Sequence, residues 1–319
     1  MNLVPTLLPR AGKTGGPIPS ILLIVGVLML ASCASLSRIG KEPVPRLVGV
    51  AYMNLETDET LIFNGHAMFH AASTMKTPVM FQLFRMRDED SLDLDAPILV
   101  KNEFKSIVDG SIFSLPIHSE KDEILYPVID RMVPLRVLID KMITHSSNLA
   151  TNILVQTAKP EDISQTLNEL GASGVLVLRG VEDLKAYELG MNNMTSAYGM
   201  MKVMEAVYRS ELVSDSSRAE MIEILKRQHY NSMIPAGLPD DVVVAHKTGS
   251  ITRIAHDAAI VYPPDAPPYI LVILTSGWDN HDEALSAGAR LATQVHRLHL
   301  GEIGIEDIPI PKIMGLDGK

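Results

Sequence analysis

The sequence predicts an α/β fold, with an antiparallel five-stranded sheet flanked by helices and an inserted all-α subdomain. Two observations carry this prediction. Strand-like apolar runs lie at both ends of the chain, two near residue 50 and three after residue 241. Between them, apolar residues recur at the spacing of helices that bury one face. We expect both sets of strands to join one sheet, because strands connected by short turns pair antiparallel.

The first strands form a predicted hairpin, in which 48–55 and 60–63 are joined by the polar turn 56–59. A helix is expected from Ser73 to about residue 87, because apolar residues at 79, 80, 83 and 84 repeat as one buried face does. Ser73 suits the cap or first turn of that helix. Further helices are predicted at 134–143, 149–157, 195–208 with Thr195 as the cap, and 216–228.

Three strand-like runs follow at 242–248, 255–261 and 269–275, and a closing helix with one apolar face covers 282–300. The stretches 102–131 and 171–193 are expected to be long irregular connections, which often carry function. His296 and His299 lie three residues apart on the closing helix, but no carboxylate or cysteine completes a metal set. The sequence therefore indicates no metal site and no cofactor.

Composition argues against nucleic acid as a partner. The chain has 319 residues, a formal net charge of −10 and only 5% aromatic residues. Phosphate-binding surfaces need a surplus of basic residues, and base-stacking surfaces need aromatic side chains. We therefore expect no nucleic-acid partner, and we expect the domain to be a monomer.

The N-terminal segment is typical of a targeting signal. Arg10 and Lys13 precede an apolar run at 18–30 that is short for a membrane span. The run ends in Leu-Ala-Ser-Cys and resembles the lipobox of bacterial lipoproteins, with Cys33 as the only cysteine of the chain. Cleavage of a signal peptide at 1–32 leaves Cys33 to be lipidated and to tether the protein to a membrane of the cell envelope. A signal-anchor helix with an incidental cysteine is the alternative.

Ser73 and Lys76 form a Ser-x-x-Lys pattern at the start of a predicted helix. Residues i and i+3 share a helix face, so the hydroxyl and the amine can meet. A serine beside a lysine is a nucleophile beside a base, provided that the lysine pKa is depressed. Taken alone, the pattern also fits a capped helix with a solvated lysine.

Two further patterns follow in order along the chain. Ser146 and Asn148 form a Ser-x-Asn pattern in the turn between two predicted helices. A Lys-Thr-Gly run at 247–249 ends a strand, where Gly249 allows the backbone to approach a ligand closely. The same tripeptide at 13–15 lies in the segment expected to be removed and carries no meaning there.

In this order, the three patterns are similar to the signature elements of the penicillin-recognising serine hydrolases, the superfamily of β-lactamases and D-Ala-D-Ala peptidases. The run MITHSSNLATNILV around the second pattern resembles class A β-lactamases in particular. The resemblance covers about 48–300. The polar stretch 33–46, with prolines at 43 and 45, is expected to be a short tether. The resemblance implies a catalytic domain at 47–319. In that domain a helical subdomain of about 73–230 is inserted between α/β parts at 47–72 and 231–319, with the site at their junction.

The resemblance implies catalytic roles for five residues. Ser73 is the nucleophile and Lys76 is its base, directly or through water. Lys247 is the second cation that helps to depress the Lys76 pKa. Ser146 passes a proton to the leaving nitrogen. The backbone N–H groups of Ser73 and Ser250 form the oxyanion hole.

The resemblance also implies a set of substrate-binding residues. Asn148 holds the substrate amide, and the strand residues Thr248, Gly249 and Ser250 line the ligand. Thr248 and Ser250 bind a substrate carboxylate. Arg253 is a further candidate for the carboxylate, although a solvated charge on a hairpin fits it equally well.

Two positions depart from the class A pattern. Ser147 stands where the family has an aspartate. The family loop Arg-x-Glu-x-x-Leu-Asn corresponds to 179–185, and Val181 takes the place of the glutamate that activates the deacylating water. Glu182 lies one residue later. Either it reaches the site in a remodelled loop, or it pairs with Arg179 in solvent.

The function implied is that of a serine hydrolase that opens a β-lactam amide through an acyl-enzyme on Ser73. Its ligand is expected to be a small-molecule β-lactam or an acyl-D-Ala-D-Ala peptide, and acylation is expected to outrun deacylation. Two alternatives remain open. One is a D-alanyl-D-alanine peptidase acting on peptidoglycan, and the other is a penicillin-binding sensor or peptidoglycan-binding module without turnover.

Overall fold

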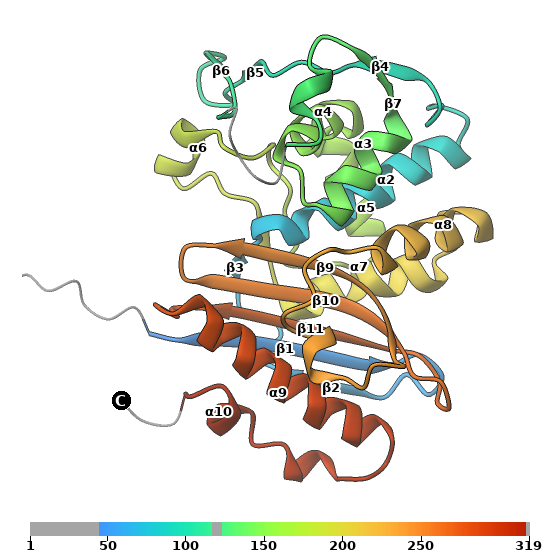
Figure 1. Ribbon diagram of the computed structural model, residues 1–319, viewed down its shortest axis with the longest axis vertical. Helices are drawn as coiled ribbons and strands as arrows, with labels where there is room; N and C mark the ends of the chain where they lie inside the picture. Colours follow the sequence, from blue (N-terminus) through green and yellow to red (C-terminus); the bar gives the residue numbers. More distant parts are fainter. Residues whose placement is uncertain (1–44, 117–122, 317–319) are drawn as a thin grey trace, which may run out of the picture. The chain divides into compact units, whose positions relative to one another are not determined.

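A computed structural model describes residues 45–116 and 123–316 (Figure 1). The predicted signal peptide, Cys33 and nearly all of the predicted tether lie outside the described residues. Pro45–Lys319 form one compact unit. Among the helices of the described part, none is long and apolar enough to cross a membrane.

A five-stranded antiparallel sheet occupies the centre of this unit. The two N-terminal strands join it beside the three C-terminal strands, and Val50 on the first strand faces Ile273 on the last. The predicted fold class is therefore confirmed. In spatial order the strands are β2 (Thr60–Phe63), β1 (Leu47–Asn54), β11 (Tyr269–Ser276), β10 (Ile254–Tyr262) and β9 (Val243–Ile251).

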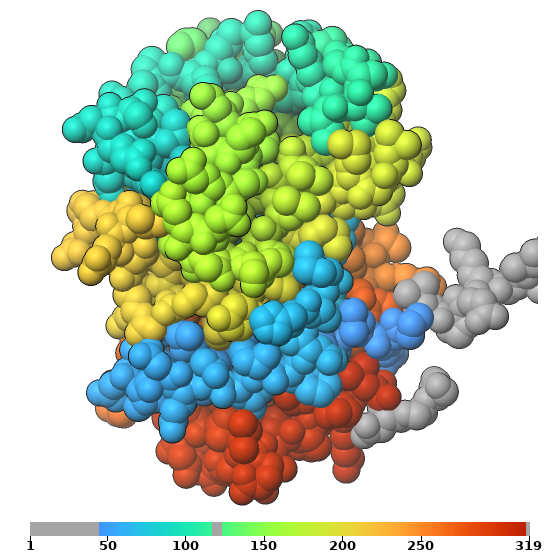
Figure 2. Space-filling view, turned by 180° about the vertical axis from the view of Figure 1, so that it is seen from behind, coloured from blue at the N-terminus to red at the C-terminus, as the bar shows by residue number. Residues whose placement is uncertain are grey.

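Each face of the sheet buries its own apolar core, because side chains alternate between the two faces along a strand. On β1, Ala51 and Met53 belong to the core shared with the helices of the middle segment. Val48 and Val50 belong to the core that packs under α9 (His281–His299). In Figure 1 the middle helices lie on one side of the sheet and α9 on the other. In Figure 2 the blue N-terminal hairpin separates the red C-terminal helix from the yellow and green helices.

The chain between β2 and β9 contains most of the remaining helices and the short strands, and a 3₁₀ turn and a short helix follow α9. A 3₁₀ turn, η1 (Ala72–Met75), leads directly into α2 (Lys76–Asp88). The other helices are α3 (Leu135–Thr144), α4 (Asn148–Ala158), α5 (Pro160–Glu169), α6 (Leu184–Glu188), α7 (Ala197–Arg209) and α8 (Asp215–Lys226), followed after α9 by α10 (Ile310–Ile313). The paired short strands are β3 (Phe69–His70) with β8 (Met194–Thr195), β4 (Pro97–Leu99) with β7 (Met132–Pro134), and β5 (Phe104–Lys105) with β6 (Ile112–Phe113); the 3₁₀ turns are η3 (Tyr126–Val128), η4 (Pro235–Gly237) and η5 (Ile305–Asp307).

Three local predictions need correction. Ser73 lies inside the η1 turn rather than at a cap, and α2 begins at Lys76. The cap of α7 is Ser196, whose hydroxyl accepts from the Gly199 N–H, rather than Thr195. Helix α5 was not expected, although its start carries the usual signals of a proline and two acids in the first turn.

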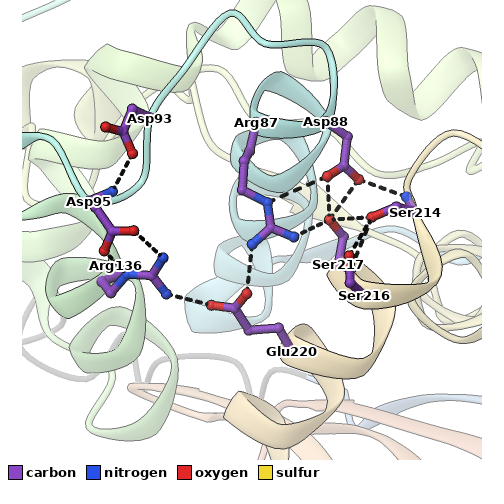
Figure 3. Close-up of polar contacts among 9 residues, drawn as sticks. All are labelled: Arg87, Asp88, Asp93, Asp95, Arg136, Ser214, Ser216, Ser217 and Glu220. Atoms are coloured by element: carbon purple, nitrogen blue, oxygen red, sulfur yellow. Dashed lines mark hydrogen bonds and ion pairs between the residues drawn. The ribbon is translucent and has the colours of Figure 1, made fainter.

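A polar network fixes the C-terminal end of α2 to the neighbouring helices (Figure 3). Glu220 on α8 accepts from Arg87 on α2 at 2.6 Å and from Arg136 on α3 at 2.9 Å. Asp88 accepts from the Ser214 N–H at 2.7 Å, at the start of α8. Partly exposed ion pairs contribute little to stability. The network joins the end of α2 to α3 and to the start of α8.

Candidate active site

Ser73 follows a strained residue. Ala72 has a φ of 46°, in the left-handed region that residues other than glycine rarely adopt. The Ala72 N–H donates to His70 Nδ1 at 3.0 Å, and the Thr74 hydroxyl donates to the Ala71 carbonyl at 2.6 Å. These bonds hold the turn that presents Ser73. Lys76 follows three residues later, as the first residue of α2.

The second pattern lies in the turn between α3 and α4. Ser146 also has a positive φ, of 58°, and its side chain is buried. Ser147 is the cap of α4, because its hydroxyl accepts from the Ala150 N–H at 3.1 Å. Aspartate and serine are both good helix caps. The departure at Ser147 therefore retains a capping side chain at this position.

Two fully buried lysines meet at the Ser146 side chain. Lys76 Nζ donates to the Ser146 carbonyl at 2.7 Å, to Ser146 Oγ at 3.1 Å and to Asn148 Oδ1 at 3.0 Å. Lys247 Nζ lies 3.2 Å from the same Ser146 Oγ and 2.9 Å from the Thr248 carbonyl. The Ser146 hydroxyl thus bridges two amines from opposite sides, an arrangement that can pass protons between them.

Strand β9 packs directly against the turn that carries Ser73. A Cβ atom added at Gly249 would lie 3.1 Å from the Ser73 nitrogen and 3.1 Å from the Thr74 nitrogen. The sequence predicted a close approach to a ligand at Gly249. In the structure, the close approach is to the backbone of Ser73 and Thr74. It sets how near β9 can come to the nucleophile.

Two cavities open at Ser73, and Ser250 lines both of them. The first has a volume of about 300 Å³ and lies between β9 and the loop 179–193, with Asn148 and Glu182 in its lining. The second has a volume of about 240 Å³ and lies between β9, residues near Tyr230 and the start of α9. A substrate bound across Ser73 can therefore extend to either side of it.

The loop at 179–193 is held at Val181 by Asn152 from α4. Asn152 Oδ1 accepts from the Val181 N–H at 2.6 Å, and Asn152 Nδ2 donates to the Val181 carbonyl at 3.0 Å. Arg179 is buried and donates to the carbonyls of Met191 and Gly180 at 2.9 and 3.0 Å. The Arg179 guanidinium thus hydrogen-bonds to the backbone of its own loop rather than forming a solvated pair with Glu182.

Glu182 adopts a φ of 62°, again in the left-handed region. Its Oε1 lies 3.5 Å from Asn148 Nδ2, at the long limit of a hydrogen bond, and the residue lines the first cavity together with Ser73. The loop therefore brings the Glu182 carboxylate to the cavity, although Glu182 follows the family position by one residue.

Arg253 does not lie where a carboxylate-binding residue was expected. It occupies the turn between β9 and β10 with a φ of 62°, and its guanidinium forms an ion pair with Asp279. Among the described residues that line the two cavities, Arg253 does not occur. The structure instead places His281, the first residue of α9, in the second cavity, with Nε2 3.3 Å from Ser250 Oγ. Sequence reasoning missed His281, because no local signal relates it to β9.

Two further histidines lie beneath the site. His256 on β10 is buried, its Nε2 donates to the His70 carbonyl at 3.0 Å, and its Nδ1 accepts from the Thr275 N–H at 3.1 Å. Burial lowers the pKa of His256 to about 4. Burial and, secondarily, the Arg179 charge lower the pKa of His70. Both imidazoles are therefore neutral at physiological pH.

The family model of the β-lactamase enzyme family matches residues 36–298 of this chain. The chain belongs to the β-lactamase enzyme family. The resemblance seen in the three sequence patterns is thereby confirmed.

Similar proteins agree with this assignment. The chain is 27% identical over 233 residues to a β-lactamase of Bacillus licheniformis, covering 72% of this chain and 71% of that protein. It is 24% identical over 240 residues to β-lactamase 3 of Bacillus cereus, covering 74% and 70%. Two solved structures share the fold. PBP-A has a TM-score of 0.68 at 21% identity, covering 91% of this chain and 100% of that one, and an ancestral class A β-lactamase has a TM-score of 0.70 at 19% identity, covering 85% and 98%.

Proposed function

We propose that this protein is a serine hydrolase that opens the amide of a β-lactam through an acyl-enzyme on Ser73 and that deacylates slowly. One observation carries the proposal. The Ser146 hydroxyl bridges the buried amines of Lys76 and Lys247, and Ser146 lines the second of the two cavities that meet at Ser73. Buried amines around a bridging hydroxyl, next to an accessible serine, suit nucleophilic attack on a carbonyl.

In the acylation step, Ser73 Oγ attacks the carbonyl carbon of the lactam as its proton passes to Lys76. The N–H groups of Ser73 and Ser250 stabilise the oxyanion, as the family resemblance implies. Collapse of the tetrahedral intermediate breaks the C–N bond. The Ser146 hydroxyl delivers a proton to the leaving nitrogen and is reprotonated from its lysine partners. The products of this step are an ester on Ser73 and an opened ring that stays attached to it.

In the deacylation step, a water must attack the Ser73 ester with the help of a general base. Val181 takes the family position of that base and cannot accept a proton. General-base catalysis is typically worth about 10² to 10⁴-fold in rate. Glu182 supplies the nearest replacement, since its carboxylate reaches the same cavity, but its contact with Asn148 is long. We infer that the acyl-enzyme persists for minutes. Penicillin consumption should then show a fast burst as the enzyme is acylated, followed by a slow steady state.

A second candidate is a D-alanyl-D-alanine peptidase of peptidoglycan. The observation that favours it is Val181, held by Asn152 at the position of the deacylating base. A peptidase that passes its acyl group to an amine has less need of an activated water. A substituted PBP-A has been solved as an acyl-enzyme complex with penicillin G, which shows that this fold can hold such an adduct.

The test is intact-mass spectrometry of the protein mixed with a penicillin and followed over time. We expect a covalent adduct on the wild type that is absent from Ser73→Ala, a variant that loses one oxygen and should stay folded. An equal yield of adduct on Ser73→Ala would refute the proposal. If the wild type forms an adduct that is never released, the protein is not a β-lactamase, and the peptidase and the sensor remain. Release of D-alanine from a pentapeptide identifies a peptidase.

Two loop variants form a matched pair for the deacylation step. Val181→Glu restores a carboxylate at the family position and should shorten the lifetime of the adduct. Glu182→Gln should lengthen it and leave the burst unchanged, because it removes charge with little change in shape. If the wild type clears penicillin rapidly and Glu182→Gln does so equally rapidly, the base is another residue.

We also propose that the mature protein is a monomer in the cell envelope, attached to a membrane by lipid on Cys33. The lipobox-like sequence that ends at Cys33 supports this. Acyl chains bind a bilayer with about 0.8 kcal/mol per buried CH₂. Cys33→Ser should therefore move the processed protein into the soluble envelope fraction or leave the precursor uncleaved. Unchanged membrane partition of a processed Cys33→Ser protein would contradict lipid anchoring.

A further inference from the structure

We propose that His281 binds the carboxylate of the substrate, together with the Ser250 hydroxyl, in the second cavity, and so selects carboxylate-bearing substrates. Penicillins and acyl-D-Ala-D-Ala peptides both carry a carboxylate next to the amide nitrogen that departs. The inference rests on the proposed acylation of Ser73. It adds the residue that recognises the far end of the substrate.

The geometry of the second cavity carries this inference. His281 Nε2 and Ser250 Oγ lie 3.3 Å apart, and both residues line the cavity that opens at Ser73. A carboxylate has two oxygens that accept in one plane, so two adjacent donors can each bind one oxygen. Thr248 lines the same cavity. The buried amine of Lys247 lies just behind, bonded to the Thr248 carbonyl at 2.9 Å.

Two other basic side chains near the cavity are committed elsewhere. Arg253 forms an ion pair with Asp279 at the hairpin turn. His256 lines the floor of the cavity but is neutral, and both of its ring nitrogens already bond to backbone groups. His281, in contrast, lines this cavity with its Nε2 atom beside the Ser250 hydroxyl.

The start of α9 is not itself the anion site. The first N–H groups of the helix, those of Asp282 and Glu283, donate to the Asn280 side chain at 3.0 and 3.3 Å. The ligand must therefore be bound by the His281 side chain rather than by the helix terminus. The negative charge of Glu283, two residues after His281, is partly compensated, because Glu283 forms an ion pair with Arg46 at 2.8 Å.

The experiment compares the acylation of Ser73 by benzylpenicillin and by its methyl ester, in which the carboxylate is masked. The rate of adduct formation is followed by intact mass. We expect the wild type to prefer the free acid. His281→Ala should lower the ratio of acid to ester rates by about 10-fold or more, the usual worth of a hydrogen bond to a charged group. The rate with the ester should change little, which controls for folding.

Two further variants sharpen the result. His281→Arg should keep or increase the preference for the acid, because a guanidinium is a permanently charged donor. Arg253→Ala should keep the wild-type ratio, because Arg253 forms an ion pair with Asp279 and lines neither cavity. If Arg253→Ala loses the preference and His281→Ala keeps it, the carboxylate binds at the hairpin and the inference is overturned.

The remaining outcomes separate this inference from the proposed function. If the wild type is acylated by neither compound, the proposed function fails and the inference fails with it. If the wild type reacts with both compounds at the same rate, the proposed function stands and the inference alone is overturned. An equal loss of rate with both compounds in His281→Ala would show a structural role and would also overturn it.

Discussion

Acidification should destabilise the protein through His256, the buried imidazole beneath the active site. In the folded protein His256 must stay neutral, because Nδ1 accepts a hydrogen bond from the Thr275 N–H. A proton on Nδ1 would replace this hydrogen bond by a repulsive contact between two N–H donors. Burial lowers its pKa from 6.5 to about 4. The unfolded chain therefore binds a proton at higher pH than the folded protein does.

The sign and the size follow from proton linkage. The stabilisation that comes from keeping His256 neutral is fully present above pH 6.5, and it is lost as the pH falls from 6.5 towards 4. At about 1.4 kcal/mol per pH unit, this interval corresponds to about 3 kcal/mol of unfolding free energy. About 2 kcal/mol of it should be lost between about pH 7 and about pH 5.

The assay is urea unfolding of the wild type and of His256→Gln at several pH values, followed by circular dichroism. Glutamine can still donate to the His70 carbonyl but does not titrate. Carboxylates elsewhere titrate in both proteins, so the difference between the two pH profiles isolates His256. We expect the wild type to lose about 2 kcal/mol more than the variant between about pH 7 and about pH 5. Parallel profiles would refute the reasoning.

Two further substitutions test how the site is positioned. Gly249→Ala should slow acylation by penicillin by about 10² in rate, because the new Cβ lies 3.1 Å from the Ser73 and Thr74 nitrogens and must push β9 away. A full rate at an unchanged melting temperature would show that the strand yields without cost. Asn152→Ala removes both hydrogen bonds to Val181 and should lower the unfolding free energy by about 1–3 kcal/mol. The 179–193 loop should also be cut faster by protease, and an unaltered digestion rate would contradict this role.

The sequence alone predicted the fold class, most of the long elements in their order, and the three patterns that resemble the family. The switch from alternating to helical periodicity located α2, α3 and α4, and the shift back located β9 to β11. These patterns are local, because the periodicity of apolar side chains within one segment is enough to predict a strand or a helix with one buried face. The patterns at Ser73, Ser146 and 247–249 carried the family resemblance for the same reason.

The tertiary structure decided what depends on contacts between distant segments. No local signal shows that the Ser146 hydroxyl bridges Lys76 and Lys247, because the three residues come from a turn, a helix and a strand. The course of the 179–193 loop is likewise set from outside, by Asn152 and by the left-handed backbone of Glu182. The Glu182 carboxylate therefore lies at the first cavity. The spacing of the sequence pattern alone did not predict this position.

The region around Ser250, where we propose that the substrate carboxylate binds, also differs between sequence prediction and structure. Sequence placed Arg253 near the substrate because it follows the Lys-Thr-Gly strand by a few residues. The structure turned Arg253 towards Asp279 and brought His281 to Ser250 from 31 residues away. The position of His281 depends on how α9 packs across the sheet, which is set by the apolar core beneath that helix. Local pattern thus predicted the candidate catalytic residues, whereas the packing of remote elements decided which side chains line the cavities beside Ser73.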